Sequence, residues 1–196
     1  MQNSIIKNTL VQYYKFFTIA ILICVGVLGI SAMLPTKSVT AQAATTNPVA
    51  NCDKAKLTGT VFGSTPSYQN DPNTTFDKAY DGDITTYFDY LNPNGGLVGL
   101  DLGVDTKASL SSVCLYPRPA YYNDTRVNGA IIQGSNDNLS YTNIVTVSGV
   151  VQGQWTEVNA NNTTPYRYYR YLSPDGSYSN IAEIKFFGST SASPAI

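Results

Sequence analysis

The chain has 196 residues, of which only 13% are charged, with 12 Lys and Arg against 13 Asp and Glu, and it contains no histidine. The net charge of −1 argues against a nucleic-acid-binding protein, which needs a basic patch. The absence of histidine excludes a Ser-His-Asp triad and a histidine general base. After residue 50, nine basic residues face all thirteen acids, so this part of the chain is acidic.

The N-terminal segment has the pattern of an export signal. Residues 16–34 form one apolar run without a charge, preceded by Lys7 and Lys15 and followed by Ala41-Gln42-Ala43. Small residues at this spacing are typical of signal-peptidase cleavage. The run is also long enough to span a bilayer. We therefore expect residues 1–43 to be a signal peptide, with an uncleaved N-terminal membrane anchor as the alternative. Either way, the remainder is expected to be secreted or to lie on the extracellular face of the membrane.

One domain is expected after this segment. Residues 44–51 are predicted to be a polar linker, residues 52–188 a domain of ordinary size, and residues 189–196 a C-terminal tail of small residues. If Cys24 is removed with the signal, Cys52 and Cys114 remain. An even cysteine count in an oxidising compartment favours a disulfide between them, with two separate buried thiols as the alternative.

Eight short β-rich runs, bounded by Gly, Asn, Asp and Pro, follow one another without helical periodicity. They lie at 56–64, 97–103, 109–117, 129–135, 143–149, 154–158, 166–174 and 180–188. Such runs predict an all-β protein with an antiparallel sandwich or jelly roll. The run "YRYYRYL" mixes tyrosines with arginines. We interpret it as a core strand with a solvated outer face rather than as a surface that stacks nucleic-acid bases.

The stretch "DKAYDGDITTYFDY" (77–90) gathers four aspartates in a chain with few charges. An EF-hand loop that begins at Asp81 requires Gly at its sixth and Glu at its twelfth position, which are Thr86 and Asn92 here. A metal-binding pair for nucleotide-sugar chemistry requires an α/β domain, for which the chain has no helices. A glycosidase requires two acids across a cleft, whereas these aspartates lie mainly in turn-like sequence. An enzyme is therefore not expected.

A structural calcium site fits this loop better. Calcium binds six to eight oxygens and accepts backbone carbonyls as readily as carboxylates. Asp81, Asp83 and Thr86 offer side-chain oxygens around a tight turn at Gly82. These are too few, so a distant segment must complete the site. Glu183 is the candidate, because it lies within an apolar strand where an unpaired carboxylate is costly.

Several separated motifs, in the same order, resemble the discoidin family, also called coagulation factor 5/8 type C. They are "KAYDGDITTYFDY", "GLVGLDLG", "VCLYPR", "GAIIQGSNDN" and "YRYYRYLSPDGSYSNIAEIKFFG". The similarity runs from about residue 54 to 188 and is greatest to bacterial family 32 carbohydrate-binding modules. It implies a jelly-roll β-sandwich of the galactose-binding-domain-like type with a buried structural calcium. The calcium ligands it implies are carbonyls of Lys78, Asp83 and Ala182 and side-chain oxygens of Asp81, Thr86 and Glu183.

The resemblance also implies a function: a non-catalytic exported carbohydrate-binding module that binds a glycan through loops at one end of the sandwich. Sugar recognition needs an aromatic face and planar polar groups. The stretches "YLNPNGG" and "RPAYYNDTR" offer both, and the candidate ligand-binding residues are Tyr90, Asn92, Asn94, Arg118, Tyr121, Tyr122 and Arg126. Members of the family that bind galactose often use a histidine, which this chain lacks, so galactose is not predicted as the ligand.

A second class of function remains open. Animal members of the family bind phospholipid head groups or proteins, so the alternative is a cell-surface adhesion domain. Docking to a membrane needs exposed apolar side chains ringed by basic residues. The candidate loops are instead rich in tyrosine and asparagine with two arginines, which favours a glycan partner.

Overall fold

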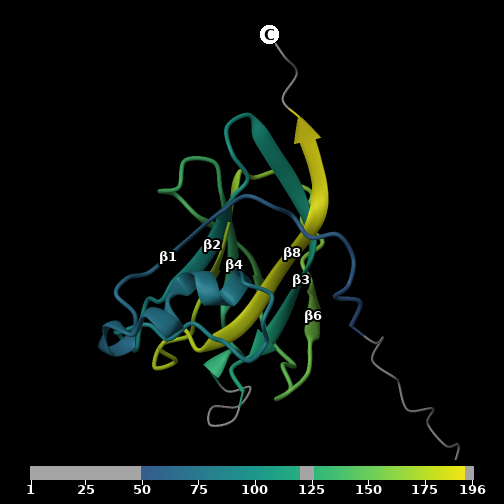
Figure 1. Cartoon of the computed structure of the whole chain (residues 1–196). Helices are drawn as coiled ribbons and strands as arrows, with labels where there is room; N and C mark the ends of the chain where they lie inside the picture. Colours follow the sequence, from purple (N-terminus) through teal and green to yellow (C-terminus); the bar gives the residue numbers. More distant parts are fainter. Residues whose placement is uncertain (1–49, 120–125, 193–196) are drawn as a thin grey trace, which may run out of the picture. The chain divides into compact units, whose positions relative to one another are not determined.

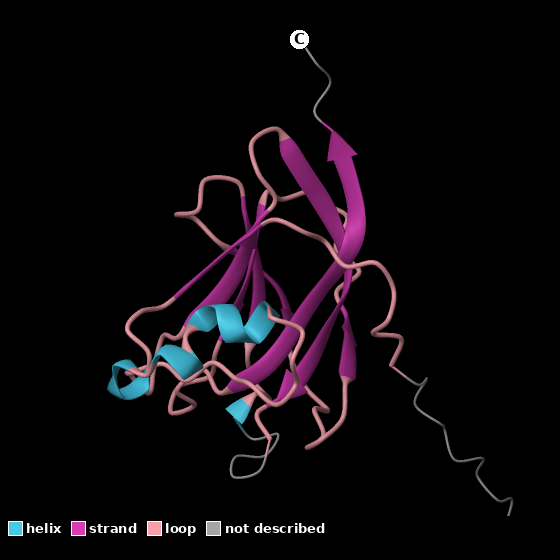
Figure 2. Cartoon of the chain, viewed as in Figure 1, coloured by secondary structure: helices cyan, strands magenta, loops and turns pink. Residues whose placement is uncertain are grey.

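The computed structural model describes residues 50–119 and 126–192. Figures 1 and 2 show a protein built mainly of strands, with short 3₁₀ helices to one side. The strands are β1 (Thr60–Gly63), β2 (Leu97–Asp101), β3 (Thr106–Pro117), β4 (Ile131–Ser135), β5 (Thr142–Thr146), β6 (Thr156–Asn159), β7 (Tyr168–Leu172) and β8 (Ile181–Ala192). The helices are η1 (Tyr68–Asn70), η2 (Pro72–Thr74) and η3 (Phe76–Tyr80). Each predicted run overlaps one strand, so the all-β prediction is confirmed.

The strands form two antiparallel sheets with the core between them. One sheet has the order β1-β2-β7-β4-β5 and the other the order β6-β3-β8. Along β7, Tyr169 and Tyr171 are fully buried, whereas Tyr168 and Arg170 are half-buried on the opposite face. This alternation is the one predicted for "YRYYRYL". The inner faces of both sheets contribute to one apolar cluster that includes Val98, Leu100, Ile132, Tyr169 and Tyr171 with Val113, Leu115, Ile184 and Phe186.

The C-terminal end of the domain differs from the predicted limit, and a contact at the N-terminal end involves the predicted linker. Residues 189–192, expected in the tail, belong to β8, because Ser189–Ala192 pair with Thr106–Ser109 of β3. Small polar residues give no hydrophobic signal, yet their backbone groups satisfy those of the first half of β3. At the other end, the backbone N–H of Asn51, expected in the linker, donates to Glu157 Oε2 at 3.0 Å. This bond attaches Asn51 to β6.

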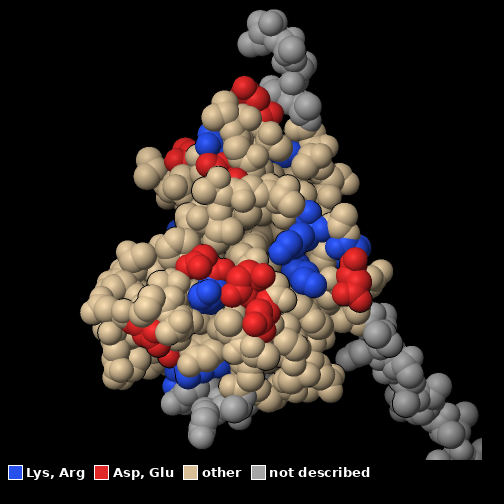
Figure 3. Space-filling model, in the orientation of Figure 1, with Lys and Arg blue, Asp and Glu red and all other residues tan. Residues whose placement is uncertain are grey.

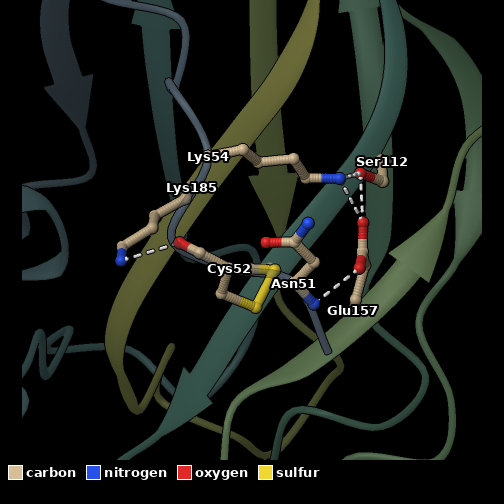
Figure 4. The surroundings of a disulfide bond; sticks show 7 residues. Asn51, Cys52, Lys54, Ser112, Glu157 and Lys185 are labelled. Atoms are coloured by element: carbon tan, nitrogen blue, oxygen red, sulfur yellow. Dashed lines mark hydrogen bonds and ion pairs between the residues drawn. A yellow bond between two sulfur atoms is a disulfide. The ribbon is translucent and has the colours of Figure 1, made fainter. Parts of the chain in front are cut away.

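A disulfide joins the N-terminal segment to β3. Cys52 and Cys114 have their sulfurs 2.04 Å apart and their Cα atoms 5.8 Å apart. They pack with Phe187 and Trp155 in a small cluster separate from the main core. The neighbouring backbone is also held, because Lys185 Nζ donates to the carbonyl of Cys52 at 3.1 Å (Figure 4). The disulfide thus ties the start of the domain to the outer side of the three-stranded sheet.

A hydrogen-bonded ion pair reinforces this attachment. Lys54 Nζ lies 2.5 Å from Glu157 Oε1 and donates to Ser112 Oγ at 3.0 Å. The Ser112 hydroxyl in turn donates to Glu157 Oε1 at 2.7 Å (Figure 4). The three residues come from the N-terminal segment, β6 and β3, so the ion pair spans the same junction as the disulfide.

In residues 50–119 and 126–192 no helix is long and apolar enough to cross a membrane. The longest of the three 3₁₀ helices has five residues. The segment predicted as a signal peptide or anchor, residues 1–43, lies outside the described part of the chain.

Candidate functional site

A pocket of about 440 Å³ lies at one end of the sandwich. This volume is within the range of small-molecule sites in proteins. Its walls come from the η1–η2 segment, from the stretch before β2, from the segments after β3 and from the turn before β8. The lining residues are Tyr68, Gln69, Asp71, Thr74, Tyr87, Asp89, Arg118, Arg126 and Tyr178.

An ion pair between Asp89 and Arg118 lines the pocket. Arg118 Nη1 lies 2.8 Å from Asp89 Oδ2, and their side chains are 16% and 13% exposed. The side-chain amide of Asn180 donates to the other carboxylate oxygen of Asp89 at 2.7 Å. Arg118 Nη2 donates to the hydroxyl of Tyr87 at 2.7 Å, and its guanidinium stacks 3.7 Å from the centre of that ring. These contacts fix a charged, planar group in one orientation.

A second arginine extends this network. Arg126 Nη1 donates to Asn180 Oδ1 at 3.0 Å and to the carbonyl of Ser177 at 3.3 Å. Its guanidinium lies 5.2 Å from the centre of the Tyr178 ring. Asn180 Oδ1 also accepts from Arg118 Nη1 at 3.2 Å, so Asn180 links both arginines and Asp89, although it does not line the pocket.

Aromatic side chains form the wall beside this polar network. The rings of Tyr68 and Tyr178 meet edge to face at 6.2 Å, and Tyr68 is 43% exposed. Both tyrosines lie next to backbone in the left-handed region: Gln69 and Asn70 have φ of 55° and 56°, and Tyr178 and Ser179 have φ of 55° and 57°. Residues other than Gly, Asn and Asp rarely adopt this conformation, and such strain concentrates at functional sites.

The electrostatics of the pocket are balanced rather than strongly charged. Burial raises the pKa of Asp89 above its ordinary value, and the hydrogen bond from Asn180 and the positive charge of Arg118 oppose that increase. The second pocket carboxylate, Asp71, caps η2 by accepting the backbone N–H of Asn73 at 2.9 Å. Both carboxylates are thus held by protein donors.

The extended stretch that carries Asp89 explains how the pocket is formed. Phe88 forms an isolated antiparallel bridge with Ile181 and is fully buried. In extended backbone, neighbouring side chains point to opposite sides, so Tyr87 and Asp89 face away from the core that holds Phe88. The bridge brings this stretch beside the start of β8, where Asn180 lies.

The structure places the predicted ligand-binding residues in three different situations. Arg118 and Arg126 line the pocket. Tyr90 is half-buried against the core, and its hydroxyl accepts from Asn92 Nδ2 at 3.1 Å. Asn94 Oδ1 accepts the backbone N–H of Gly176 at 2.8 Å, so that it holds a turn. Tyr121 and Tyr122 lie outside the described residues.

The acidic loop after η3 forms a second candidate site together with Glu183 of β8. Glu183, in the middle of β8, is completely buried. Its Oε1 accepts the backbone N–H of Gly82 at 2.6 Å, whereas its Oε2 has no hydrogen-bond partner among the described residues. Burial, with a smaller contribution from the neighbouring carboxyl of Asp81, raises the pKa of Glu183 to about 7, although the hydrogen bond from Gly82 and the charge of Lys56 oppose that increase. Two carboxyl groups in contact, one of them buried, need either a shared proton or a cation.

The other groups of this loop are arranged around Asp81. The hydroxyl of Thr86 donates to Asp81 Oδ2 at 2.9 Å, and Lys78 Nζ lies 3.5 Å from the same oxygen. Asp83 Oδ1 instead accepts from the backbone and hydroxyl of Thr85, at 2.8 and 2.6 Å. Figure 3 shows acidic groups gathered over η3 and the loop that follows it, with a basic group among them.

This donor set fits a calcium ion that is bound mainly by carbonyls. Within residues 50–119 and 126–192, no three acidic, cysteine or histidine side chains converge on one point. A cation near Asp81 and the unpaired Glu183 oxygen would therefore need backbone oxygens, which calcium accepts. The resemblance implies such carbonyls from Lys78, Asp83 and Ala182, and the side chain of Asp83 is turned to Thr85, which is compatible with a carbonyl role.

Comparison with known proteins identifies the family. No protein-family model matches the sequence, and no curated protein matches it. Among solved structures, the CBM62 carbohydrate-binding module of Clostridium thermocellum Xyl5A has 41% sequence identity and a TM-score of 0.65, over 70% of this chain and 99% of that module. The C-terminal domain of a Bacteroides fragilis chitobiase has 17% identity and a TM-score of 0.57, over 70% of this chain and 99% of that domain.

A family 32 module, CpGH89CBM32-5 from Clostridium perfringens, in complex with GalNAc-β-1,3-galactose, has 16% identity and a TM-score of 0.52, over 65% of this chain and 95% of that module. At these low identities the chitobiase domain and the family 32 module show the shared fold. The domain is thus a carbohydrate-binding module with a galactose-binding-domain-like β-sandwich, as the sequence motifs predicted. At 41% identity over nearly the whole Xyl5A module, the chain belongs to the CBM62 family of these modules.

Proposed function

We propose that this domain binds a glycan in the pocket around Asp89 and Arg118, and that it does so without catalysing a reaction. The observation that carries the proposal is the fixed network of Asp89, Arg118, Asn180 and Arg126 beside the exposed ring of Tyr68. Sugar hydroxyls need planar donors and acceptors held in one orientation, and the C–H face of a pyranose packs on an aromatic ring. The pocket offers both within one small volume.

The state of the two pocket carboxylates supports a binding role over catalysis. A general acid or base must be able to exchange a proton with the substrate. Asp89 is held by Arg118 and Asn180, and Asp71 is held by the N–H of Asn73. A carboxylate that is fixed by donors is suited to accept a sugar hydroxyl rather than to transfer a proton.

We also propose that the domain acts outside the cell and is stabilised by calcium. The apolar N-terminal segment and the Cys52–Cys114 disulfide support export, because disulfides persist in oxidising compartments. The buried, unpaired Oε2 of Glu183 beside Asp81 supports the cation. When bound, calcium would neutralise these carboxyl groups and tie the loop after η3 to β8.

Glycan-array binding followed by calorimetry with the best ligand tests the pocket. Tyr68→Ala should abolish glycan retention while leaving the melting temperature almost unchanged, because an exposed ring contributes little to the core. Val104→Ala is the matched control: Val104 is 72% exposed and lies in the connection between β2 and β3, away from the pocket residues.

Retention by Tyr68→Ala equal to that of the parent would exclude this wall as the ligand contact. Sedimentation with phospholipid vesicles, run in parallel, addresses the alternative of a lipid-binding adhesion domain. Vesicle binding without binding to any glycan on the array would reject the proposed function.

A further inference from the structure

The outer face of the five-stranded sheet carries a row of side chains that the pocket does not use. The strand register places Phe62, Gly99, Arg170, Gln133 and Asn143 next to one another, one each from β1, β2, β7, β4 and β5. Neighbouring strands lie about 4.8 Å apart, so this row is about 19 Å long. We call it the sheet row. It has the length of a short chain of sugar rings.

Arg170 supplies a positive charge at the centre of the sheet row. Its Nε donates to Gln133 Oε1 at 2.7 Å, and its guanidinium stacks 3.5 Å from the centre of the Tyr141 ring. Throughout the described residues, no carboxylate lies within ion-pair distance of Arg170, and only its Nε has a hydrogen-bond acceptor. The terminal nitrogens of its fork are therefore available to a ligand, and an anionic ligand is favoured.

The two acids that border this face do not supply the missing counter-charge. Asp101 is bound by Arg167 through two hydrogen bonds of 2.6 and 2.7 Å. Asp137, in the loop before β5, accepts the backbone N–H groups of Leu139 and Ser140, both at 2.8 Å. Each carboxylate is thus satisfied locally, and Arg170 keeps its uncompensated charge.

An aromatic platform lies beside Arg170. A Cβ atom at Gly99 would come within 2.3 Å of Cζ of Phe62, so the Phe62 ring lies directly over the backbone of β2. Glycine weakens a strand and often marks a close approach, and here it makes room for the ring. Tyr168 meets Phe62 edge to face at 6.3 Å. Both rings are half-buried, which leaves part of each available to a sugar ring.

Amide groups complete the row. Gln133 is only 7% exposed, and its Nε2 donates to Asn143 Oδ1 at 2.6 Å. Since Gln133 Oε1 accepts from Arg170, the three side chains orient one another across β7, β4 and β5. Such a chain of oriented donors and acceptors matches the hydroxyl groups along a glycan.

We propose that the sheet row is a second carbohydrate-binding surface, and that its occupant is a glycan chain that carries uronic acid carboxylates. One carboxylate binds the guanidinium fork of Arg170, and a neighbouring sugar ring packs on Phe62. A neutral chain would leave Arg170 without a counter-charge, which is why the occupant is acidic. This surface adds to the proposed pocket and does not require that the pocket binds a sugar.

Calorimetry with the full-length protein tests the proposal. The probes are a hexamer of 1,4-linked galacturonic acid and the neutral hexamer made from it by carboxyl reduction, so that the two differ only at C6, where a hydroxymethyl group replaces each carboxylate. Arg170→Gln should weaken binding of the acidic hexamer about ten-fold or more, because a charge-assisted hydrogen bond is lost. It should leave binding of the neutral hexamer unchanged. Lys107→Gln, an exposed lysine on the other sheet, removes the same charge and should change neither.

Two further measurements separate this surface from the pocket. Phe62→Ala should also weaken binding of the acidic hexamer. In the parent, the side-chain amide NMR signals of Gln133 and Asn143 should shift when the acidic hexamer is added. Tyr68→Ala should leave its binding unchanged. No binding of the acidic hexamer by the parent, or equal binding by Arg170→Gln and Phe62→Ala, would overturn the proposal. If Tyr68→Ala lost binding of the acidic hexamer and the amide signals of Gln133 and Asn143 did not shift, the acidic hexamer would bind in the pocket. The proposed second surface would then be wrong, while the proposed function of the pocket would stand.

Discussion

Asp89 and Arg118 lie 29 residues apart in the chain, and their side chains meet in a 2.8 Å ion pair that lines the pocket. Because both are largely buried, removing one partner leaves an uncompensated charge. Asp89→Ala should therefore lower the free energy of unfolding by roughly 2–4 kcal/mol and abolish glycan binding. Urea denaturation and calorimetry measure the two effects separately.

A second pocket acid provides the comparison. Asp71→Ala removes the side-chain cap of η2 and should lower the free energy of unfolding by only about 1 kcal/mol. If Asp89→Ala were no more destabilising than Asp71→Ala, the ion pair would not hold the pocket together. Both variants are compared with the same parent protein, so the difference between their free energies of unfolding is more reliable than either free energy alone.

Removal of calcium should lower the melting temperature. A ligand that binds only the folded state stabilises it, and the proposed ligands meet only when the loop after η3 docks on β8. Glu183→Gln should abolish the sensitivity to chelator, since it removes the charge of the buried carboxylate. Asp77→Asn, an exposed acid of η3 outside the proposed ligand set, is the control and should respond to chelator like the parent. A melting curve of the parent that is indifferent to chelator would refute the calcium site.

Reduction of the disulfide should destabilise the domain without affecting the pocket. Cys52 and Cys114 close a loop with a sequence separation of 62, for which the loss of loop-closure entropy predicts about 4 kcal/mol. The double variant Cys52→Ser with Cys114→Ser should show a lower free energy of unfolding but unchanged glycan affinity, because the bridge packs with Phe187 and Trp155 outside the main core. Non-reducing mass spectrometry of exported protein that finds two free thiols would contradict the bridge itself.

Asp137 gives the stability of the domain an acid-dependent component. Hydrogen bonds from the backbone of Leu139 and Ser140 and from the hydroxyl of Ser135 lower the pKa of Asp137 from 3.8 to about 2. A carboxylate whose pKa is lower in the folded state contributes stability above pH 3.8, and this contribution disappears as the pH falls towards 2.

Between pH 5 and pH 2, the melting temperature of Asp137→Asn should therefore fall less steeply with decreasing pH than that of the parent. Asp53→Asn, which changes another exposed acid, is the matched control and should follow the parent. If the melting temperatures of all three proteins had the same dependence on pH, the carboxylate of Asp137 would not contribute to the stability of the domain.

The fold was predictable because its signals are local. The strands lie between turn residues, and in β7 the inward set, Tyr169 and Tyr171, follows directly from alternation. The end of β8 was not predictable, since Ser189–Ala192 are paired through the backbone alone. The motifs identify the shared sandwich fold rather than one family, which is why they pointed to family 32 whereas the 41% identity places the chain in CBM62.

The pocket was only partly predictable because it is made of non-local contacts. Arg118 and Arg126 were found from a loop rich in tyrosine and arginine. Asp89 was considered with the other acids of residues 77–90, yet it pairs with Arg118 and Asn180, whereas Asp81 lies beside Thr86 and Glu183. Alternation around Phe88 was a usable signal, because it sends Tyr87 and Asp89 to the same side. No local pattern indicates the distant partner Asn180, which arrives through the bridge to Ile181.

Two substitutions of Tyr178 distinguish the effect of its backbone strain from the effect of its ring on glycan binding. Its φ of 55° costs an L-residue roughly 1–2 kcal/mol, a cost that glycine does not bear. Its ring contacts Tyr68 at 6.2 Å and lies 5.2 Å from the Arg126 guanidinium. Tyr178→Ala loses the ring and keeps the strain, whereas Tyr178→Gly loses both. The glycine variant should therefore be more stable than the alanine variant by about 1 kcal/mol, and both should bind the glycan far more weakly than the parent.

Denaturation of the two variants measures the difference in stability, and calorimetry measures the loss of affinity. Equal stability of the two variants would mean that this turn relaxes at no cost and stores no strain. Binding equal to the parent in either variant would mean that the ring has no part in recognition. The combination expected here, a relaxed turn with a lost ligand, would show that the left-handed backbone at Tyr178 is retained because it aims an aromatic side chain into the pocket.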